Sequence, residues 1–164
     1  MLSTDLLLRE FTEEVKTTRR VLQCIPEEKL SWTPHPKSLS LGQLAYHVAV
    51  IPGELAMFLS ELTREVPSVP FPEATSLSEL LSALDRSEAT ATAQLSAWGE
   101  DDLMAEWKMV QGDQTIIAVP RIVMMRSILF NHWYHHRGQI LVYLRLLDVP
   151  VPAVYGSSAD ENPF

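Results

Sequence analysis

The sequence predicts an all-α fold: a four-helix bundle with one long crossover and a short β-hairpin before its last helix. Apolar side chains recur every three or four residues in four separate stretches, which is the spacing of amphipathic helices. The proline-rich segment 63–75 separates the second stretch from the third and is long enough to be a crossover. The 164 residues fit one domain, which we expect to span residues 1–164.

The first predicted helix covers residues 4–24, with an apolar face at Leu8, Phe11, Val15 and Leu22. Pro26 ends it. In the loop that follows, His35 stands between two prolines, which bias the preceding residues away from the helical region. We therefore expect His35 to face solvent. Cys24, the only cysteine, cannot form an internal disulfide and is expected to act as a small apolar residue at the helix end.

The second helix is predicted to begin at Ser40-Leu41-Gly42-Gln43. This is a capping-box pattern, in which each of the two polar side chains bonds to the backbone N–H of the other residue. The apolar seam of this helix continues to Leu62, and His47 lies beside the seam. We therefore expect His47 at the edge of the core.

Three further elements complete the prediction. A second capping-box pattern, Ser76-Leu77-Ser78-Glu79, opens the third helix, which Gly99 ends. Between residues 106 and 119 the apolar side chains no longer follow the helical spacing. They flank residues 111–114, which are typical of a turn, so this stretch predicts a short β-hairpin. Pro120 begins the fourth helix, which runs to Asp148. The tail beyond it has no helical period, but Tyr155 and Phe164 could anchor it.

Charge and hydropathy exclude several classes of protein. With a net charge of −8, the chain lacks the clustered Lys and Arg that phosphate binding needs, so we expect no nucleic-acid partner. The N-terminus lacks the basic and apolar regions of a secretory signal. The most apolar window, residues 44–59, is too short and too interrupted to span a membrane. We therefore expect a cytoplasmic protein that has no membrane partner.

The stretch richest in functional side chains is residues 131–139, which hold three of the five histidines. His132 and His136 share the spacing of Met125, Leu129 and Ile140, which predicts two imidazoles on the buried stripe of one helix. A buried imidazole group without a partner costs on the order of 1–3 kcal/mol, and a shared cation would satisfy both rings. Core histidines with ordinary hydrogen-bond partners are the alternative. His135 lies off the stripe and is expected near the surface.

Helical bundles build sites from side chains that face inward on different helices. His47 is the only other histidine on a predicted packing face, and the Glu-x-x-His pairs of di-iron bundles are absent. The sequence therefore predicts a single metal held by His47, His132 and His136, with coordination positions left open as in catalytic sites. Gln139 and Tyr46 are expected to orient these ligands or to line the pocket. The sequence reveals no general base, so the catalytic residues stay unassigned.

Several motifs resemble those of a known family. The patterns His132-x-x-x-His136-Arg137-Gly138-Gln139, Tyr143-Leu144-Arg145 and Tyr155-Gly156-Ser157-Ser158-Ala159-Asp160 resemble the C-terminal signature of the DinB/YfiT-like superfamily of metal-dependent enzymes. The stretch Ser40-Leu41-Gly42-Gln43-Leu44-Ala45-Tyr46-His47 is similar to the second helix of that family. The resemblance covers nearly the whole chain, and the spacing of the three histidines is its most specific part.

The resemblance implies an up-down-down-up four-helix bundle, a homodimer, and a divalent metal on His47, His132 and His136. Imidazole ligands suit zinc, nickel and iron, and we expect zinc or nickel. The resemblance also implies a thiol-dependent S-transferase or a related hydrolase, which acts on a small molecule together with a low-molecular-weight thiol. A non-catalytic, stress-associated binding or scaffold protein with a structural metal site is the alternative.

Overall fold

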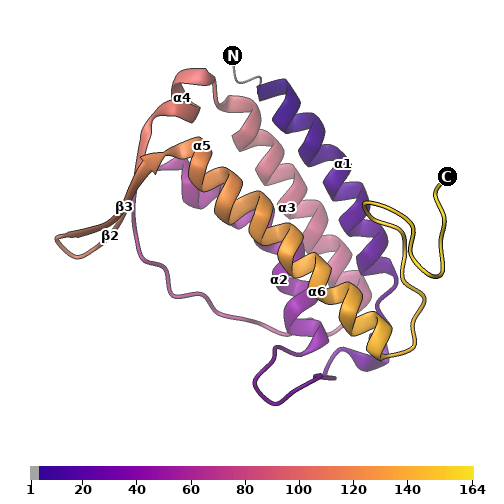
Figure 1. Ribbon diagram of the computed structural model, residues 1–164. Coiled ribbons are helices and arrows are strands. Elements are labelled where there is room, and N and C mark those ends of the chain that lie inside the picture. Colours follow the sequence, from indigo (N-terminus) through magenta and orange to yellow (C-terminus); the bar gives the residue numbers. More distant parts are fainter. Residues whose placement is uncertain (1–3) are drawn as a thin grey trace.

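Four long helical segments make up most of the computed structural model, which describes residues 4–164 (Figure 1). They are α1 (Thr4–Gln23), α2 (Leu41–Ser60), α3 (Leu77–Ala97) and a last segment composed of α5 (Arg121–Met124), η2 (Met125–Asn131) and α6 (His132–Leu146). Two short helices, η1 (Glu27–Lys29) and α4 (Glu100–Met104), lie in the connections. The four predicted helices are therefore confirmed. None of the helices described here is long and apolar enough to cross a membrane.

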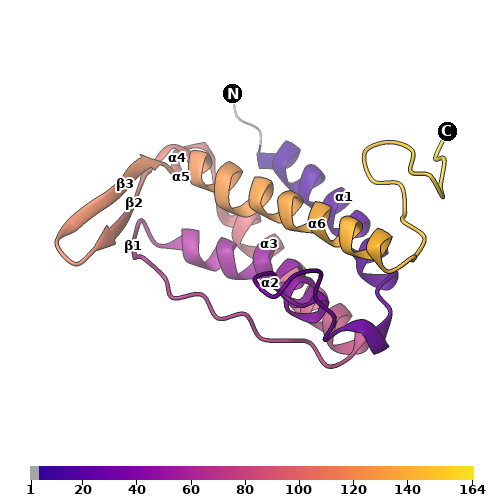
Figure 2. The same ribbon diagram turned by 60° about the horizontal axis from the view of Figure 1, so that its bottom comes forward.

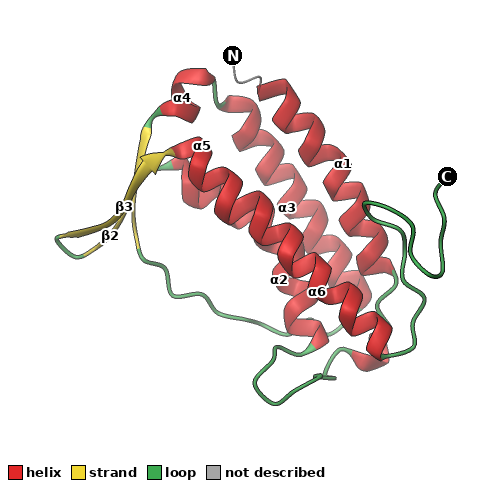
Figure 3. Ribbon diagram, viewed as in Figure 1, coloured by secondary structure: helices red, strands yellow, loops and turns green. Residues whose placement is uncertain are grey.

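A three-stranded sheet at one end of the helices corrects the all-α prediction (Figure 3). The predicted hairpin is present as β2 (Glu106–Gln111) and β3 (Gln114–Pro120), which pair antiparallel. Gly112 lies in the turn with a φ of 56°, where glycine is favoured. β1 (Thr63–Glu65) pairs parallel to β2, in a segment expected to be a long surface connection with some extended character. Three residues carry too little pattern to predict a strand, so pairing with β2 decides their structure.

The crossover between β1 and α3 runs back along α2 to the start of α3 (Figure 2). Its first part, residues 66–72, contains three prolines and has no regular structure; we call these residues the strap. The Gln43 side-chain amide donates to the Phe71 carbonyl oxygen at 3.1 Å, and the Val66 N–H donates to the Val110 carbonyl oxygen at 2.9 Å. These bonds hold the strap against α2 at one end and β2 at the other.

Serine caps set where α2 and α3 begin. At α2 the predicted capping box is complete: the Gln43 N–H donates to Ser40 Oγ at 3.1 Å, and the Ser40 N–H donates to Gln43 Oε1 at 3.0 Å. At α3 only half of it forms. The Glu79 N–H donates to Ser76 Oγ, but Glu79 Oε2 accepts from the Thr75 N–H at 2.7 Å. One satisfied donor in the first turn is enough to start α3 at the predicted position.

Pro52 lies inside α2 without ending it. Because proline has no N–H, the Val48 carbonyl four residues earlier loses its helical donor. The Trp133 indole N–H donates to that carbonyl instead, at 2.9 Å. At Gly53 the helices approach closely, since a Cβ there would lie 2.9 Å from Ser87 Cα. The Pro52-Gly53 pair thus links α2 to both α6 and α3.

The buried stripe of the last helical segment differs from the prediction. The segment η2 is π-helical, which is a wider turn than an α-helix. As a result the stripe that contains Met125 and Leu129 continues through Trp133 and Arg137 rather than through the neighbouring histidines. His132 and His136 are half-buried and border the core.

The C-terminal tail packs on the helices mainly through polar contacts. Two ion pairs hold it to the body: Asp160 with Arg145 and Glu161 with Arg20. The Tyr155 hydroxyl lies 2.5 Å from Arg137, so Tyr155 anchors the tail as predicted. Phe164 is 95% exposed, and the prediction that it serves as an anchor is wrong.

Candidate metal centre

Three imidazoles from two helices meet at one point. α2 carries His47, and α6 carries His132 and His136 one turn apart. The Nε2 atoms of His47 and His132 are 3.4 Å apart, and those of His132 and His136 are 2.9 Å apart. One ring nitrogen from each histidine lies within 4.8 Å of the other two. The fold thus brings together the three residues singled out in the sequence, and the cluster could hold a metal ion.

Hydrogen bonds on the outer side of two rings decide their tautomers. His132 Nδ1 lies 3.1 Å from the Ile128 carbonyl oxygen, and His136 Nδ1 lies 2.7 Å from Gln139 Oε1. Because both oxygens accept, both Nδ1 atoms donate, and in a neutral ring Nε2 then carries a lone pair. The 2.9 Å contact between the two Nε2 atoms therefore has no hydrogen to share. Such facing lone pairs are stabilised by a cation, and the outer bonds are those typical of metal-binding histidines.

Desolvation keeps the imidazoles neutral. Burial lowers the pKa of His47 to about 4, and the neighbouring His136 and His132 add to the shift. Burial also lowers the pKa of His132 and of His136, although the hydrogen bonds to Ile128 and to Gln139 oppose it. Neutral imidazole is the form that binds metal ions. The three rings are therefore in the ligand form at neutral pH.

The cluster lines a cavity of about 290 Å³ between α2, α6 and the strap. The Phe71 ring of the strap meets the His47 ring edge-on, with 5.0 Å between the ring centroids. Apolar side chains form most of the remaining wall, among them Ile51, Leu55, Phe58 and Val69. Apolar walls with a few polar groups are the usual composition of a small-molecule site.

The other residues singled out in the sequence lie at different places in the structure. His35 and His135 are both exposed, as predicted, and lie outside the cluster. Gln139 accepts from His136, as expected for a residue that orients a ligand. Tyr46 does not line the histidine pocket but a separate cavity between α2 and α3, so its expected role beside the histidines is not met.

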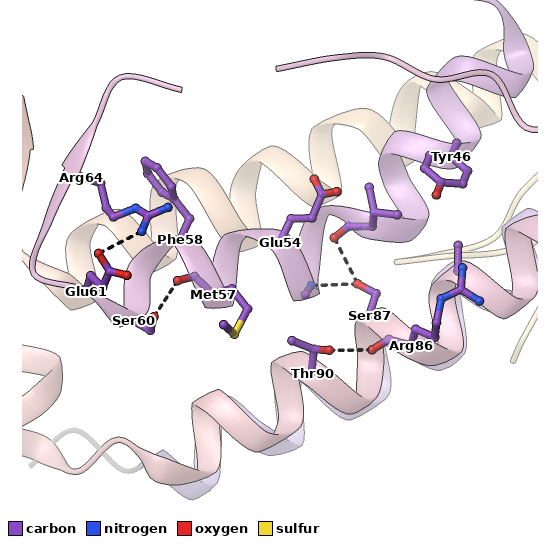
Figure 4. Close-up of a pocket in the computed structure, with 13 residues that line it drawn as sticks. Tyr46, Glu54, Met57, Phe58, Ser60, Glu61, Arg64, Arg86, Ser87 and Thr90 are labelled. Carbon is purple, nitrogen blue, oxygen red and sulfur yellow. Dashed lines mark hydrogen bonds and ion pairs between the residues drawn. The ribbon is translucent and has the colours of Figure 1, made fainter. Parts of the chain in front are cut away.

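That second cavity is larger, about 520 Å³ (Figure 4), but three of the hydroxyl groups that line it already donate to backbone carbonyls. The three bonds are Ser87 to Val50, Thr90 to Arg86 and Ser60 to Met57. At one end of the cavity, Arg64 forms an ion pair with Glu61 at 3.0 Å. Across residues 4–164, the three histidines are the only group with metal-ligand spacing. The smaller, histidine-lined pocket is therefore the candidate site.

Glu54 is a pocket residue that the sequence analysis missed. It lies on α2, seven residues after His47, and lines both cavities. Burial alone raises the pKa of its carboxyl, because no charged neighbour contributes to the shift. The spacing from His47 through Ile51 to Glu54 places the three residues on one helical face. That spacing is the signal by which the sequence could have identified it.

Comparison with known proteins places the chain in a family. The model of the DinB family matches residues 1–162. The uncharacterized protein YrdA of Bacillus subtilis (strain 168) is 25% identical over 158 residues, which cover 96% of this chain and 90% of that protein.

Two solved structures share the fold. A DinB-like protein from Bacillus cereus ATCC 10987 is similar at a TM-score of 0.73 with 25% identity, over 90% of this chain and 95% of that one. The DinB-like protein YjoA from Bacillus subtilis matches at a TM-score of 0.70 with 16% identity, over 93% of this chain and 99% of that one. Together with the match of the family model over nearly the whole chain, these likenesses lead to one conclusion: the chain belongs to the DinB family.

Proposed function

We propose that this protein is a metal-dependent enzyme in which His47, His132 and His136 hold one divalent cation. The observation that carries the proposal is the 2.9 Å contact between the Nε2 atoms of His132 and His136, whose ring hydrogens lie on the opposite nitrogens. Three protein ligands beside an open pocket are typical of catalytic rather than structural sites. Zinc or nickel suits these ligands best, and iron is compatible with them.

The chain itself contributes binding, orientation and exclusion of water. The Ile128 carbonyl and the Gln139 side chain keep the Nε2 atoms of His132 and His136 directed toward His47. The apolar walls and the strap limit the water around a molecule bound in the pocket, which strengthens electrostatic interactions there. When bound, a divalent cation supplies Lewis acidity, which lowers the pKa of a thiol or of water beside it.

We propose that a low-molecular-weight thiol and a small electrophilic molecule are the substrates. In this S-transfer the thiol loses its proton to solvent, its sulfur forms a bond to an electrophilic carbon, and the leaving group departs with the electron pair. The resemblance to thiol-dependent members of the superfamily supports this reaction, and the size of the cavity supports small substrates. A hydrolase, with water in place of the thiol, is the related alternative.

We also propose a topology, an oligomeric state and a class of substrate for the whole chain. The packing of α3 and of α6 against both α1 and α2 supports an up-down-down-up four-helix bundle. The family resemblance supports a homodimer. The net charge of −8 supports a small-molecule enzyme over a nucleic-acid-binding protein, because it repels phosphate.

Elemental analysis of tag-free protein tests the site. Replacing His47, His132 or His136 by Ala should each lower the metal content sharply, because three protein ligands become two. His35→Ala and His135→Ala serve as controls and should leave the metal content unchanged. A wild-type protein that contains no metal after gentle purification, or a His136→Ala variant that holds as much as the wild type, would contradict the site.

A screen of the metal-loaded protein tests the reaction. Bacillithiol-, mycothiol- and glutathione-type thiols are each combined with electrophilic acceptors, and turnover that disappears in His136→Ala supports the S-transferase. Hydrolysis of an ester or amide without any thiol supports the hydrolase. If fully loaded protein turns over none of these substrates, a binding or scaffold protein with a structural metal becomes the better account.

A further inference from the structure

The histidine pocket is a slot along α2 with functional groups at separate positions. His47, Ile51, Glu54 and Phe58 lie along one face of α2 and line it in order. The strap runs alongside, with the Phe71 ring against His47 and Pro67 lining the pocket with Phe58. The rise of a helix places Glu54 about 10 Å along the axis from His47. A molecule that binds at the histidines and extends along the slot therefore reaches Glu54.

Glu54 is the only Asp, Glu, Lys or Arg residue that lines this slot. The remaining lining consists of apolar side chains, Ser68 and the three histidines. No lysine or arginine lines the slot. An anionic group at this position would therefore meet a like charge without a compensating cation.

The Glu54 carboxylate is also free to bind a ligand. In Figure 4 its side chain projects from α2 on the side opposite α3, away from Arg86 and Ser87. None of the nine ion pairs within residues 4–164 includes it. By contrast, Glu61, which directly follows the last residue of α2, is paired with Arg64. Glu54 is exposed, and a carboxylate that has no partner is stabilised most by a cationic donor.

We propose that Glu54 selects the substrate: the thiol that enters this slot carries an ammonium or similar cationic group about 10 Å from its sulfur, with an apolar chain between them. This inference rests on the proposed function, because the sulfur end is assigned to the metal-loaded histidines. Ile51, Leu55 and Val69 contact the apolar chain, and Glu54 accepts hydrogen bonds from the cationic end. A charge-assisted bond of this kind changes affinity by about ten- to hundredfold.

Three thiols of one length test the proposal: 6-aminohexane-1-thiol, 6-mercapto-1-hexanol and 6-mercaptohexanoate. Each is titrated at about pH 8, above the ordinary pKa range of carboxyl groups, into protein loaded with Co²⁺. Binding is followed by the sulfur-to-cobalt absorption band, which requires no turnover. The aminothiol should bind about ten- to hundredfold more tightly than the alcohol, and the carboxylate most weakly. Glu54→Gln should remove these differences, whereas the control Glu61→Gln should preserve them.

The outcomes separate this inference from the proposed function. Three results would overturn the role of Glu54 and leave the metal site intact. They are equal affinities for the three thiols, tighter binding of 6-mercaptohexanoate, and an unchanged preference in Glu54→Gln. Protein that takes up no Co²⁺, or loaded protein whose absorption none of the thiols changes, would overturn the proposed function and this inference with it. Circular dichroism of Glu54→Gln shows that a lost preference does not reflect misfolding.

Discussion

Arg137 is only 1% exposed, next to His136 in the chain, and its guanidinium lies over the rings of Tyr134 and Tyr155, 5.3 Å from each centroid. Its guanidinium forms an ion pair with Glu14 at 2.5 Å and donates to Thr18 Oγ1 at 3.0 Å. The Tyr155 hydroxyl of the tail also contacts it. Arginine is rarely this buried unless it is paired. Arg137 therefore ties α6 to α1 and to the tail beside the candidate metal centre.

Replacing Arg137 with Ala should lower the free energy of unfolding by about 3 kcal/mol, because the largely buried carboxylate of Glu14 loses its charged partner and keeps only the Tyr155 hydroxyl. Lys16→Ala is the control, since it breaks a pair with Glu13 whose side chains are 64% and 71% exposed. It should cost less than about 1 kcal/mol. Urea unfolding measures both variants. Equal losses would show that burial of the Arg137 pair makes no difference to its contribution.

At the scale of elements, substitutions at two helical glycines test how closely the helices pack. Gly53→Ala should destabilise the protein by about 1–3 kcal/mol, because the new methyl group would lie 2.9 Å from Ser87 Cα and 3.1 Å from its carbonyl oxygen. Gly138 is the matched control: it lies inside α6, and no atom is within 4 Å of a Cβ added there. Gly138→Ala should stabilise by about 0.5–1 kcal/mol through lower backbone entropy. Thermal melts that show the same sign at both sites would contradict this packing.

The C-terminal tail should detach at acid pH. Hydrogen bonds from Arg145 and from a backbone N–H lower the pKa of Asp160, and those from a backbone N–H and from Arg20 lower the pKa of Glu161. A carboxyl whose pKa is lowered by folding stabilises the folded form above its unfolded pKa, and this contribution is lost as pH falls through the lowered value. We therefore expect the tail to stay bound from neutral pH down to about 4 and to detach below it.

Amide hydrogen exchange of residues 151–161 measures the detachment, with the amides of α1 and α3 as an internal reference for global unfolding. The double variant Asp160→Asn, Glu161→Gln should show fast exchange in the tail already at neutral pH. Tail protection that is the same in this variant as in the wild type would show that the carboxylates do not hold the tail.

At the scale of the whole molecule, metal binding should stabilise the fold, because its ligands come from α2 and α6. A cation that binds only the folded chain adds about 2.7 kcal/mol at a free concentration of 100 times Kd. For a chain of this size that corresponds to a rise in Tm of roughly 5–10 °C. Melts with chelator and with added zinc or nickel measure it, and His47→Ala should show no such rise. A wild-type Tm indifferent to both additions would leave the three residues as ordinary core histidines.

The sequence by itself determined the features that depend on near neighbours in the chain. The start of α2 follows from Ser40 and Gln43, whose side chains cap the free N–H groups of the first turn. The hairpin follows from a turn-rich centre between two short apolar runs. His132 and His136 could be paired in advance because residues four apart share a helical face. His47 followed as the remaining histidine on a packing face.

Only the tertiary structure decided the features that depend on segments far apart in the chain. β1 is a strand because residues 63–65 pair with β2, and Arg137 is buried because Glu14 of α1 pairs with it. The π-helical turn before His132 moved the core stripe by one residue and left the histidines at the pocket wall. Glu54 became a pocket residue because the strap lies alongside α2. Strand pairing, burial of charge and cavity shape arise from such long-range contacts, which override local propensity and which no local pattern contains.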